Sequence, residues 1–542
     1  MTIRHRPKAG LCRCNHRDSL PKLLLSWITD VRVPALATAT YDLLVIGGGV
    51  NGAAIARDAA GRGLKVLLAE KDDLAAHTSS ASTKLIHGGL RYLEFFEFRL
   101  VREALQEREI ILAMAPHITW PLRFVLPHEP SHRPAWMVRI GLFLYDHLAH
   151  RRTLKGTETI HLRRHLIGRD LRDDLSTAFV YSDGWVDDSR LVVLTALDAA
   201  ERGAAIRTHT AVTAAARHAD HWSVTLAPRN GPVESVTARL LVNAAGPWAG
   251  DILHRQLAIP GSRTVRLVKG SHIVVPRLYE GDHAFIFQNN DNRIVFAIPY
   301  EGAFTLIGTT DIAFSGDPST PHADDSEIAY LCTAVNAYFK RRISPADVVW
   351  TFSGVRPLFD DGALAASKVS RDYVLDLDAP PGAAPVLTVF GGKITTHREL
   401  ALRAMAALRP CLPHGGTDWT ATAPLPGGDI PDAGIPAFIA VVRERWPFLS
   451  EATARRMVRA YGTRLERILG EARSAADLGN DFGCGFSTAE LAYLVRQEWA
   501  STAEDVLWRR SKLGLHLPKS AQEAVKTAIE QLVPGNQPFS RS

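Results

Sequence analysis

The spacing of hydrophobic and polar residues changes several times along the chain, and each change predicts a different element. Between Tyr41 and Glu70 an apolar run is followed by clustered glycines, an alanine-rich helical pattern and a second apolar run. Short apolar runs on either side of a helical pattern are typical of buried parallel strands. The segment therefore predicts a β–α–β unit, with one strand at Asp42–Ile46 and a second ending at Glu70.

Two later segments are predicted to return to the same sheet. Residues Arg239–Leu253 contain a buried strand that breaks at Gly246, and residues Val386–Leu400 contain a strand, paired glycines and a helix. Between them KGSHIVVP, RIVFAIPY and FTLIGTT show strand patterns, which predict a mainly antiparallel second sheet. We therefore expect two interleaved layers.

The C-terminal part shows a different pattern. Residues 409–436 are rich in Pro and Gly and are predicted to be a linker, whereas residues 437–542 show helical spacing of apolar side chains. The predicted fold is α/β: a Rossmann-like nucleotide-binding domain interleaved with an antiparallel-sheet substrate domain over 41–408, then a helical C-terminal domain.

Composition and charge narrow the function classes. The 542 residues are 46% apolar and 22% charged, as in soluble globular proteins. Residues 1–40 carry seven Lys or Arg and two Asp, so five of the six net positive charges lie in this extension. We predict that the extension is disordered, because its apolar run LLLSWI is too short for a signal peptide. The remaining chain is nearly neutral, which disfavours nucleic-acid binding.

The five cysteines do not predict a disulfide framework, because they are few and scattered, which suits a reducing compartment. Cys12, Cys14 and His16 lack a nearby fourth ligand, so we predict no metal site.

The glycines after the first strand form a dinucleotide fingerprint. Gly47 is expected to make the turn, Gly49 to let a pyrophosphate approach the backbone, and Gly52 to allow close helix packing. The helix N-terminus would offer N–H groups to phosphate, and Glu70 would accept hydrogen bonds from a ribose. The chain has one such fingerprint and no second for a nicotinamide site, which favours FAD over NAD.

Several motifs resemble the FAD-dependent glycerol-3-phosphate dehydrogenase family, in particular its aerobic, membrane-associated bacterial type. They are SSASTKLIHGGLRYLE, RPAWMVRIGLFLYDHL, KGSHIVVP, SGVRPL, SRDY and FGGKITT, within residues 42–514. The resemblance implies oxidation of sn-glycerol 3-phosphate to dihydroxyacetone phosphate, with FAD as cofactor and a membrane quinone as electron acceptor. Further predicted FAD contacts are Ser79, Ser80, Gly89, Ala245, Gly246 and Gly392.

A phosphomonoester substrate needs cationic side chains, because it carries nearly two negative charges. With the resemblance, Arg91, Arg371 and Lys393 are predicted to bind substrate, although any one arginine alone would be interpreted as a surface residue. Removing a hydride also requires the hydroxyl to lose its proton. His272 is the predicted base and Arg356 the group that stabilises the oxyanion, with a hydrogen bond from Tyr92. An ordinary strand histidine is the alternative for His272.

Other polar residues are predicted to be structural. Asp187 and Asp188 are expected to cap a helix, Asp311 to lie in a turn, and EALQERE (103–109) to form a solvated helix face. His397 departs from the family pattern, in which the segment GGKITTH usually ends in Tyr, and this puts the local packing or substrate hydrogen bonding in doubt.

Two other functions stay open. The first is an FAD-dependent amine or amino-acid oxidase of the same superfamily, in which the arginines would bind a carboxylate. The number of cationic side chains favours a phosphate instead. The second is a flavin-binding protein that engages nucleic acid or a partner without turnover. The sequence also leaves open whether the chain forms a homodimer.

A membrane quinone requires access to lipid, but no apolar run reaches the roughly 18 to 20 residues of a spanning helix. The segment Ala135–His150 places apolar residues on one helical face. It is predicted to lie on anionic lipid at the cytoplasmic face, as a peripheral attachment. A core helix is the alternative. The apolar face comprises Trp136, Ile140, Phe143 and Leu144, and the basic residues around it are Arg133, Arg139, Arg151, Arg152, Lys155, Arg163, Arg164 and Arg169.

Overall fold

The computed structural model describes most of the chain from Ala39 onward. The predicted N-terminal extension therefore lies almost wholly outside the described residues, and so does Arg371. The described residues are 39–129, 134–259, 265–289, 291, 293–359, 373–412, 415–431 and 434–533.

The first sheet has a parallel centre built from three distant parts of the chain. Its order is β17-β18-β10-β1-β2-β7, with β17 antiparallel to β18 and the β8–β9 hairpin extending from β10. The bounds are β1 Thr40–Ile46, β2 Val66–Ala69, β7 Ala205–Arg207, β8 Thr210–Arg217, β9 Trp222–Pro228, β10 Glu234–Asn243, β17 Val374–Asp378 and β18 Val386–Phe390.

Helices pack on this sheet because their small and branched residues share its core. Helix α1 contacts both α4 and α7, and all three contribute to one apolar cluster with the central strands. These helices are α1 Val50–Gly61, α4 Asp188–Glu201 and α7 His397–Leu408, and a short helix α5 covers Ala249–Asp251. Asp187 caps α4 by accepting a hydrogen bond from the Arg190 N–H, as predicted. Asp188 instead lies inside the helix.

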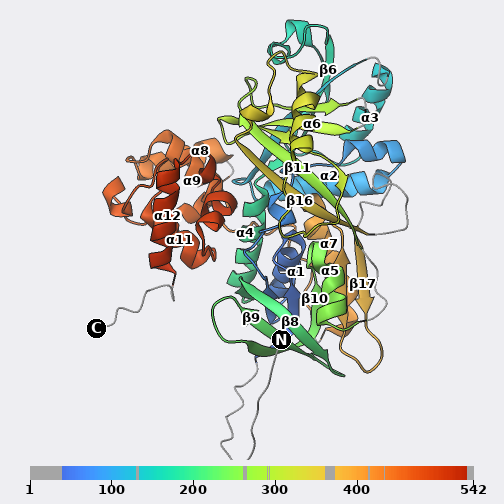
Figure 1. The fold of residues 1–542 in the computed structure, drawn as a ribbon, viewed down its shortest axis with the longest axis vertical. Coiled ribbons are helices and arrows are strands. Elements are labelled where there is room, and N and C mark those ends of the chain that lie inside the picture. The colour runs from blue at the N-terminus through green and yellow to red at the C-terminus, as the bar shows by residue number, and fades with distance from the viewer. Residues whose placement is uncertain are drawn as a thin grey trace, which may run out of the picture. The chain divides into compact units, whose positions relative to one another are not determined.

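The second sheet is predominantly antiparallel, as expected, and Figure 1 shows it beside α6. Its order is β15-β11-β14-β13-β12-β4-β6-β3, with β16 on β11 and β5 on β6. Its strands come from before and after β10, so the predicted interleaving of the two layers is confirmed. The bounds are β3 Leu85–Ile86, β4 Thr119–Pro127, β5 Glu158–His161, β6 Thr177–Val186, β11 Val265–Pro276, β12 Ala284–Gln288, β13 Ile294–Tyr300, β14 Phe304–Gly308, β15 Ile312–Ala313 and β16 Trp350–Phe359.

Three further helices flank this sheet: α2 Phe98–Met114, α3 Ala135–His147 and α6 Asp325–Asn336. The expectation that residues 103–109 form a solvated face of α2 is wrong. Glu107, Arg108 and Glu109 are buried, because Glu107 pairs with Arg398 of α7 and Arg108 pairs with Asp183 of β6. Among the described helices, none is long and apolar enough to cross a bilayer.

The C-terminal part consists of helices with their own apolar core, coloured orange to red in Figure 1. Its first helix begins at Gly434, slightly before residue 437. The helices are α8 Gly434–Arg445, α9 Glu451–Tyr461, α10 Glu466–Leu469, α11 Thr488–Gln497 and α12 Lys519–Leu532, and a one-turn π-helix, η12, covers Asp505–Arg510.

Candidate functional site

The glycine fingerprint forms a tight turn between β1 and α1. Gly47 has φ +109°, a conformation that favours glycine. A Cβ on Gly52 would lie 1.9 Å from the Gly47 carbonyl oxygen, so only glycine allows the helix to start this close to the strand. The N-terminus of α1 therefore faces the carboxyl end of β1, where a nucleotide pyrophosphate fits.

Glu70 follows β2 and lies directly beside the fingerprint. Its carboxylate accepts hydrogen bonds from the N–H groups of Gly48 at 2.6 Å and Asp72 at 2.8 Å. Burial raises the pKa of Glu70, and the two backbone donors act in the opposite direction. This is the position from which an acid binds the ribose of a dinucleotide.

Two further predicted FAD contacts, Ser79 and Ala245, lie at the same turn. Ser79 lies in the short helix η1 (Thr78–Ser80) and accepts a hydrogen bond from the Val50 N–H at 3.0 Å. Ala245 lies beside Gly47, and Gly246 follows with φ +55°.

Asn51 joins the start of α1 to a second glycine turn, because its side-chain amide donates to the Gly391 carbonyl at 3.1 Å. A Cβ on Gly392 would lie 2.6 Å from the amide nitrogen of Asn51. The third turn, at Gly89, also has positive φ and precedes the short helix η2 (Leu90–Phe95). Asn51 thus brings the first two of these glycine turns together, as expected of a site that binds a dinucleotide such as FAD.

His272 and Arg356 lie on adjacent antiparallel strands, β11 and β16. The His272 ring stacks on Phe352 with 4.8 Å between ring centroids, and its Nε2 lies 3.0 Å from the Thr83 hydroxyl. Its Nδ1 is buried without a hydrogen-bond partner among the described residues. Burial, helped by the charges of Lys84 and Arg356, holds the pKa of His272 well below its ordinary value. The imidazole is therefore neutral.

Two strand glycines make room for these side chains. A Cβ on Gly308 would lie 2.1 Å from the His272 ring, and a Cβ on Gly270 would lie 2.3 Å from an Arg356 nitrogen. Glycine inside a strand is unfavourable unless another group needs the space. The lack of a side chain at Gly308 and Gly270 thus leaves space for the His272 ring and the Arg356 guanidinium.

Arg356 is oriented by the segment after β14. Its guanidinium donates to the Thr310 carbonyl at 3.1 Å and lies 3.4 Å from the carboxylate of Asp311. The prediction that Asp311 lies in a turn is wrong, because it lies in the link between β14 and β15. This carboxylate compensates part of the charge of Arg356.

Lys393 and Tyr92 come together from distant segments. The Lys393 ammonium lies 4.1 Å from the centre of the Tyr92 ring, a cation–π contact. The two segments are held together because the His87 N–H donates to the Thr395 hydroxyl. Arg91 is half-buried on η2 beside Tyr92. Among the described residues, neither Arg91 nor Lys393 forms an ion pair with a carboxylate.

Two residues close to His272, Thr83 and Lys84, are not predicted from the sequence. Lys84 is buried, and its ammonium donates to Asp188 at 2.8 Å and to the Ser80 carbonyl at 3.0 Å. Thr83 precedes it and contacts His272. The lysine directly before the apolar pair Leu85–Ile86 is an available signal, because buried lysines are rarely unpaired.

His397 lies just after η8 (Ile394–Thr396), the turn that follows Lys393. The ring is buried, and its Nδ1 must donate to the Ile394 carbonyl at 2.7 Å, since a carbonyl only accepts. Burial lowers the pKa of His397 to about 4, so the ring is neutral. His397 therefore supports the backbone of this turn.

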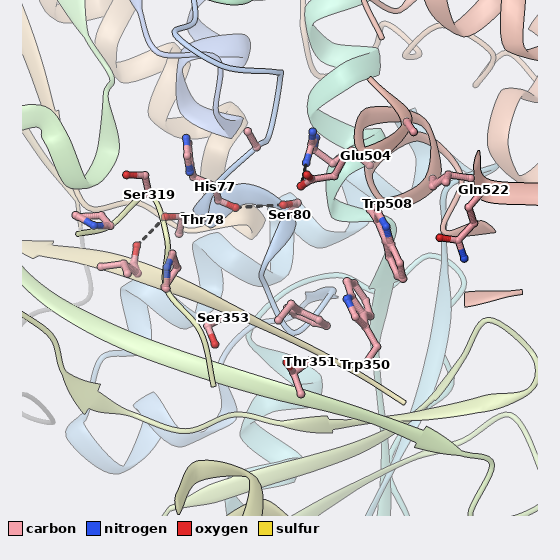
Figure 2. Close-up of a pocket in the computed structure, with 18 of the residues that line it drawn as sticks. His77, Thr78, Ser80, Ser319, Trp350, Thr351, Ser353, Glu504, Trp508 and Gln522 are labelled. Carbon is pink, nitrogen blue, oxygen red and sulfur yellow. Dashed lines mark hydrogen bonds and ion pairs between the residues drawn. The ribbon is translucent and has the colours of Figure 1, made fainter. Parts of the chain in front are cut away.

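A cavity of about 490 Å³ lies beside the loop that follows Glu70. Figure 2 shows His77, Thr78 and Ser80 of this loop facing residues of β16 and of the C-terminal helices. Trp350 of β16 stacks on Trp508 of η12, with 4.5 Å between ring centroids. The C-terminal domain thus reaches the loop of the predicted cofactor site.

Comparisons with known proteins cover nearly the whole described chain. Residues 42–398 match a family described as FAD dependent oxidoreductase, and residues 419–534 match the C-terminal domain of alpha-glycerophosphate oxidase. The chain is 54% identical over 486 residues to D-erythritol 1-phosphate dehydrogenase of Brucella abortus, which covers 90% of this chain and 97% of that protein. It is 52% identical over 482 residues to glycerol-3-phosphate dehydrogenase of Pseudomonas aeruginosa, covering 89% and 93%.

A solved structure is similar along the same length. Glycerol-3-phosphate dehydrogenase from Bacillus halodurans, complexed with FAD, matches with a TM-score of 0.70 and 25% sequence identity. The match covers 93% of this chain and 96% of that chain.

Proposed function

The chain belongs to the family of FAD dependent oxidoreductases, and we propose that it oxidises sn-glycerol 3-phosphate to dihydroxyacetone phosphate. One observation carries the proposal: about half of the residues are identical, over nine tenths of the chain, to dehydrogenases named for phosphorylated polyols. Arg91 and Lys393 form no ion pair with a carboxylate among the described residues, which fits such a substrate, because a phosphate would supply the negative charge.

Arg91 and Lys393 would bind the phosphate group. Arg91 lies on the short helix η2 after Gly89, and Lys393 directly precedes η8. The cation–π contact with Tyr92 orients the Lys393 ammonium. Arg371, which lies outside the described residues, is proposed as a further phosphate ligand.

Oxidation of the secondary alcohol removes a hydride from carbon 2 and a proton from its hydroxyl. FAD, when bound, supplies the acceptor for the hydride. His272 would take the proton through its Nδ1, which has no hydrogen-bond partner among the described residues. Arg356 would stabilise the negative charge that develops on the alcohol oxygen, with a hydrogen bond from the Tyr92 hydroxyl.

A second candidate substrate is D-erythritol 1-phosphate. It is favoured by the 54% identity to the Brucella abortus dehydrogenase of that name. The same phosphate ligands and the same base would serve, since both substrates combine a phosphate with a secondary alcohol.

Anaerobic titration of the purified flavoprotein distinguishes these candidates. The flavin absorbance should bleach with sn-glycerol 3-phosphate, and should not bleach with glycerol or with an amino acid. Stronger bleaching by D-erythritol 1-phosphate than by sn-glycerol 3-phosphate would favour the second substrate. Bleaching by the amino acid alone would refute both and support an amino-acid oxidase.

We also propose that the enzyme passes electrons to a membrane quinone at the cytoplasmic face. Helix α3 supports this, because its apolar side chains are exposed: Trp136 is 62% exposed, Ile140 52% and Phe143 60%. Its inner face is held by Leu142 and Tyr145, which are buried. The basic residues Arg151, Arg152 and Lys155 follow this helix.

Co-sedimentation with anionic liposomes tests the attachment. The wild type should bind, and either the triple change of Arg151, Arg152 and Lys155 to Glu or the change Phe143→Ser should weaken binding. Val441→Ser is a matched control, because Val441 is a 57% exposed apolar residue of α8. Equal binding by the wild type and both test variants would contradict the proposal, as would no binding by the wild type.

A further inference from the structure

We infer that the C-terminal helical domain is part of the FAD site, because Arg509 and Arg510 hold the loop after Glu70 in the conformation that binds the cofactor. Both arginines would be positioning residues, acting through Asp73. The inference rests on the FAD site described above, and it holds whichever phosphorylated polyol is oxidised.

Asp73 is enclosed by these two arginines. The two nitrogens of the Arg510 fork donate to the two carboxylate oxygens of Asp73, at 2.6 and 2.7 Å, and Arg509 Nε donates to one of them at 2.7 Å. The side chains of Asp73 and Arg510 are 1% and 0% exposed. Three charge-assisted hydrogen bonds in a dry environment give the loop a single preferred position.

The loop is connected to the fingerprint on its other side. The Asp72 N–H donates to Glu70, and the Ala75 N–H donates to the Gly48 carbonyl at 3.2 Å. Leu74 between them is fully buried. A shift of Asp73 would therefore move one of the two backbone donors that hold Glu70, and would also strain the contact with Gly48.

The charges around Asp73 are compensated within the protein. Asp505 and Glu504 accept from Arg509, and Glu498 accepts from Arg190, so each of the three guanidinium groups has a carboxylate partner. Asp73, His209 and Asp505 lie close enough together to share a cation. The arginines already supply the positive charge there. We therefore interpret the cluster as a structural contact between the domains and not as a metal site.

A second contact between the same domains provides a matched control. Arg464 lies in the C-terminal domain and pairs with Glu201 at the end of α4, at 2.6 Å. Its side chain is 6% exposed, similar to that of Arg509. Loss of this pair would weaken the attachment of the C-terminal domain without a direct effect on the loop after Glu70.

The test uses the full-length holoenzyme with three single variants: Arg510→Met, Asp73→Asn and Arg464→Met. FAD release on dilution is followed by the rise in flavin fluorescence, which gives the FAD dissociation constant without any substrate. If the binding-competent loop falls to about one tenth of the population, the constant should rise roughly tenfold. We expect this rise for Arg510→Met and Asp73→Asn, and less than about twofold for Arg464→Met.

Two outcomes would overturn the inference. One is wild-type FAD affinity in both Arg510→Met and Asp73→Asn. The other is an equal loss of FAD affinity in Arg464→Met, which would mean that attachment of the domain alone matters. If Arg510→Met does not fold, Asp73→Asn decides the question, because it keeps the size of the side chain. Bleaching of the remaining holoenzyme by the substrate reports separately on the proposed function.

Discussion

Two groups of cationic side chains, one buried in the protein interior and one half-buried at the candidate site, have opposite surroundings. Arg398 of α7 is buried against Glu107 of α2, and Arg510 is buried against Asp73. Arg91 and Lys393 lie half-buried in turns and have no ion pair with a described carboxylate. The first group is neutralised by the protein itself, whereas the second can be neutralised by an anionic ligand.

The difference separates stability from function. Removing one partner of a buried pair leaves an uncompensated charge in a medium that solvates it poorly. Removing a cation that is paired only when a ligand is bound changes the free energy of unfolding little, but it weakens the binding of that ligand. The two groups should therefore respond differently to the same substitution.

The largest effect is expected for Arg398→Ala. Glu107 would be left buried without its partner, so the free energy of unfolding should fall by about 3 to 5 kcal/mol in urea titrations. The double variant Glu107→Gln with Arg398→Met removes both charges and should recover a large part of this loss. A loss below about 1 kcal/mol in Arg398→Ala would contradict the structural role of the pair.

A smaller effect, on catalysis, is expected for Arg91→Ala and Lys393→Ala. Each removes a charge-assisted hydrogen bond to phosphate of about 1.5 to 3 kcal/mol, which lowers kcat/KM roughly 10- to 150-fold. Steady-state kinetics with sn-glycerol 3-phosphate measures this, and urea titration should show nearly unchanged stability. Arg467→Ala, at a 55% exposed position of the C-terminal domain, is the control. Wild-type kinetics in both variants would exclude the phosphate site.

His397 is a third case, a buried base that stays neutral. Its pKa is about 4 in the folded protein and about 6.5 in the unfolded chain. Between these values only the unfolded chain binds the proton, so stability is lost as the pH falls below 6.5. The loss from this residue should be about 1.5 kcal/mol between pH 6.5 and 5.

The matched variant is His397→Gln, in which an amide can still donate to the Ile394 carbonyl but does not titrate. Its free energy of unfolding, measured in urea at several pH values, should fall less steeply in acid by the equivalent of one proton. Parallel pH profiles for the two proteins would show that His397 is protonated in the folded state as well.

The nucleotide-binding unit could be predicted from the sequence because its signals are local. The strand, the glycine turn, the helix and Glu70 lie within thirty residues, and β1, α1 and β2 form where the pattern indicates. The charged face of α2 could not be predicted in this way. Its partners Asp183 and Arg398 are 75 and 291 residues away, so only the fold determines that the face is buried.

The candidate site shows the same limit. Arg91, His272 and Arg356 can be assigned only by resemblance to a family, since the local sequence around each is also that of an ordinary structural residue. Thr83 was missed because its contact with His272 joins residues 189 positions apart. A local sequence pattern contains no information on contacts between residues that are so far apart in the chain.

Gly308 and Gly270 have a consequence for protein engineering. Both lie in strands and neither has a φ in the left-handed region, so backbone conformation does not mark either position as one that needs glycine. The added methyl group would nevertheless push aside the His272 ring or the Arg356 guanidinium, which lie about 2 Å from its position. Engineering of this protein should therefore keep glycine at both positions, because any added side chain would displace a group assigned to the chemistry.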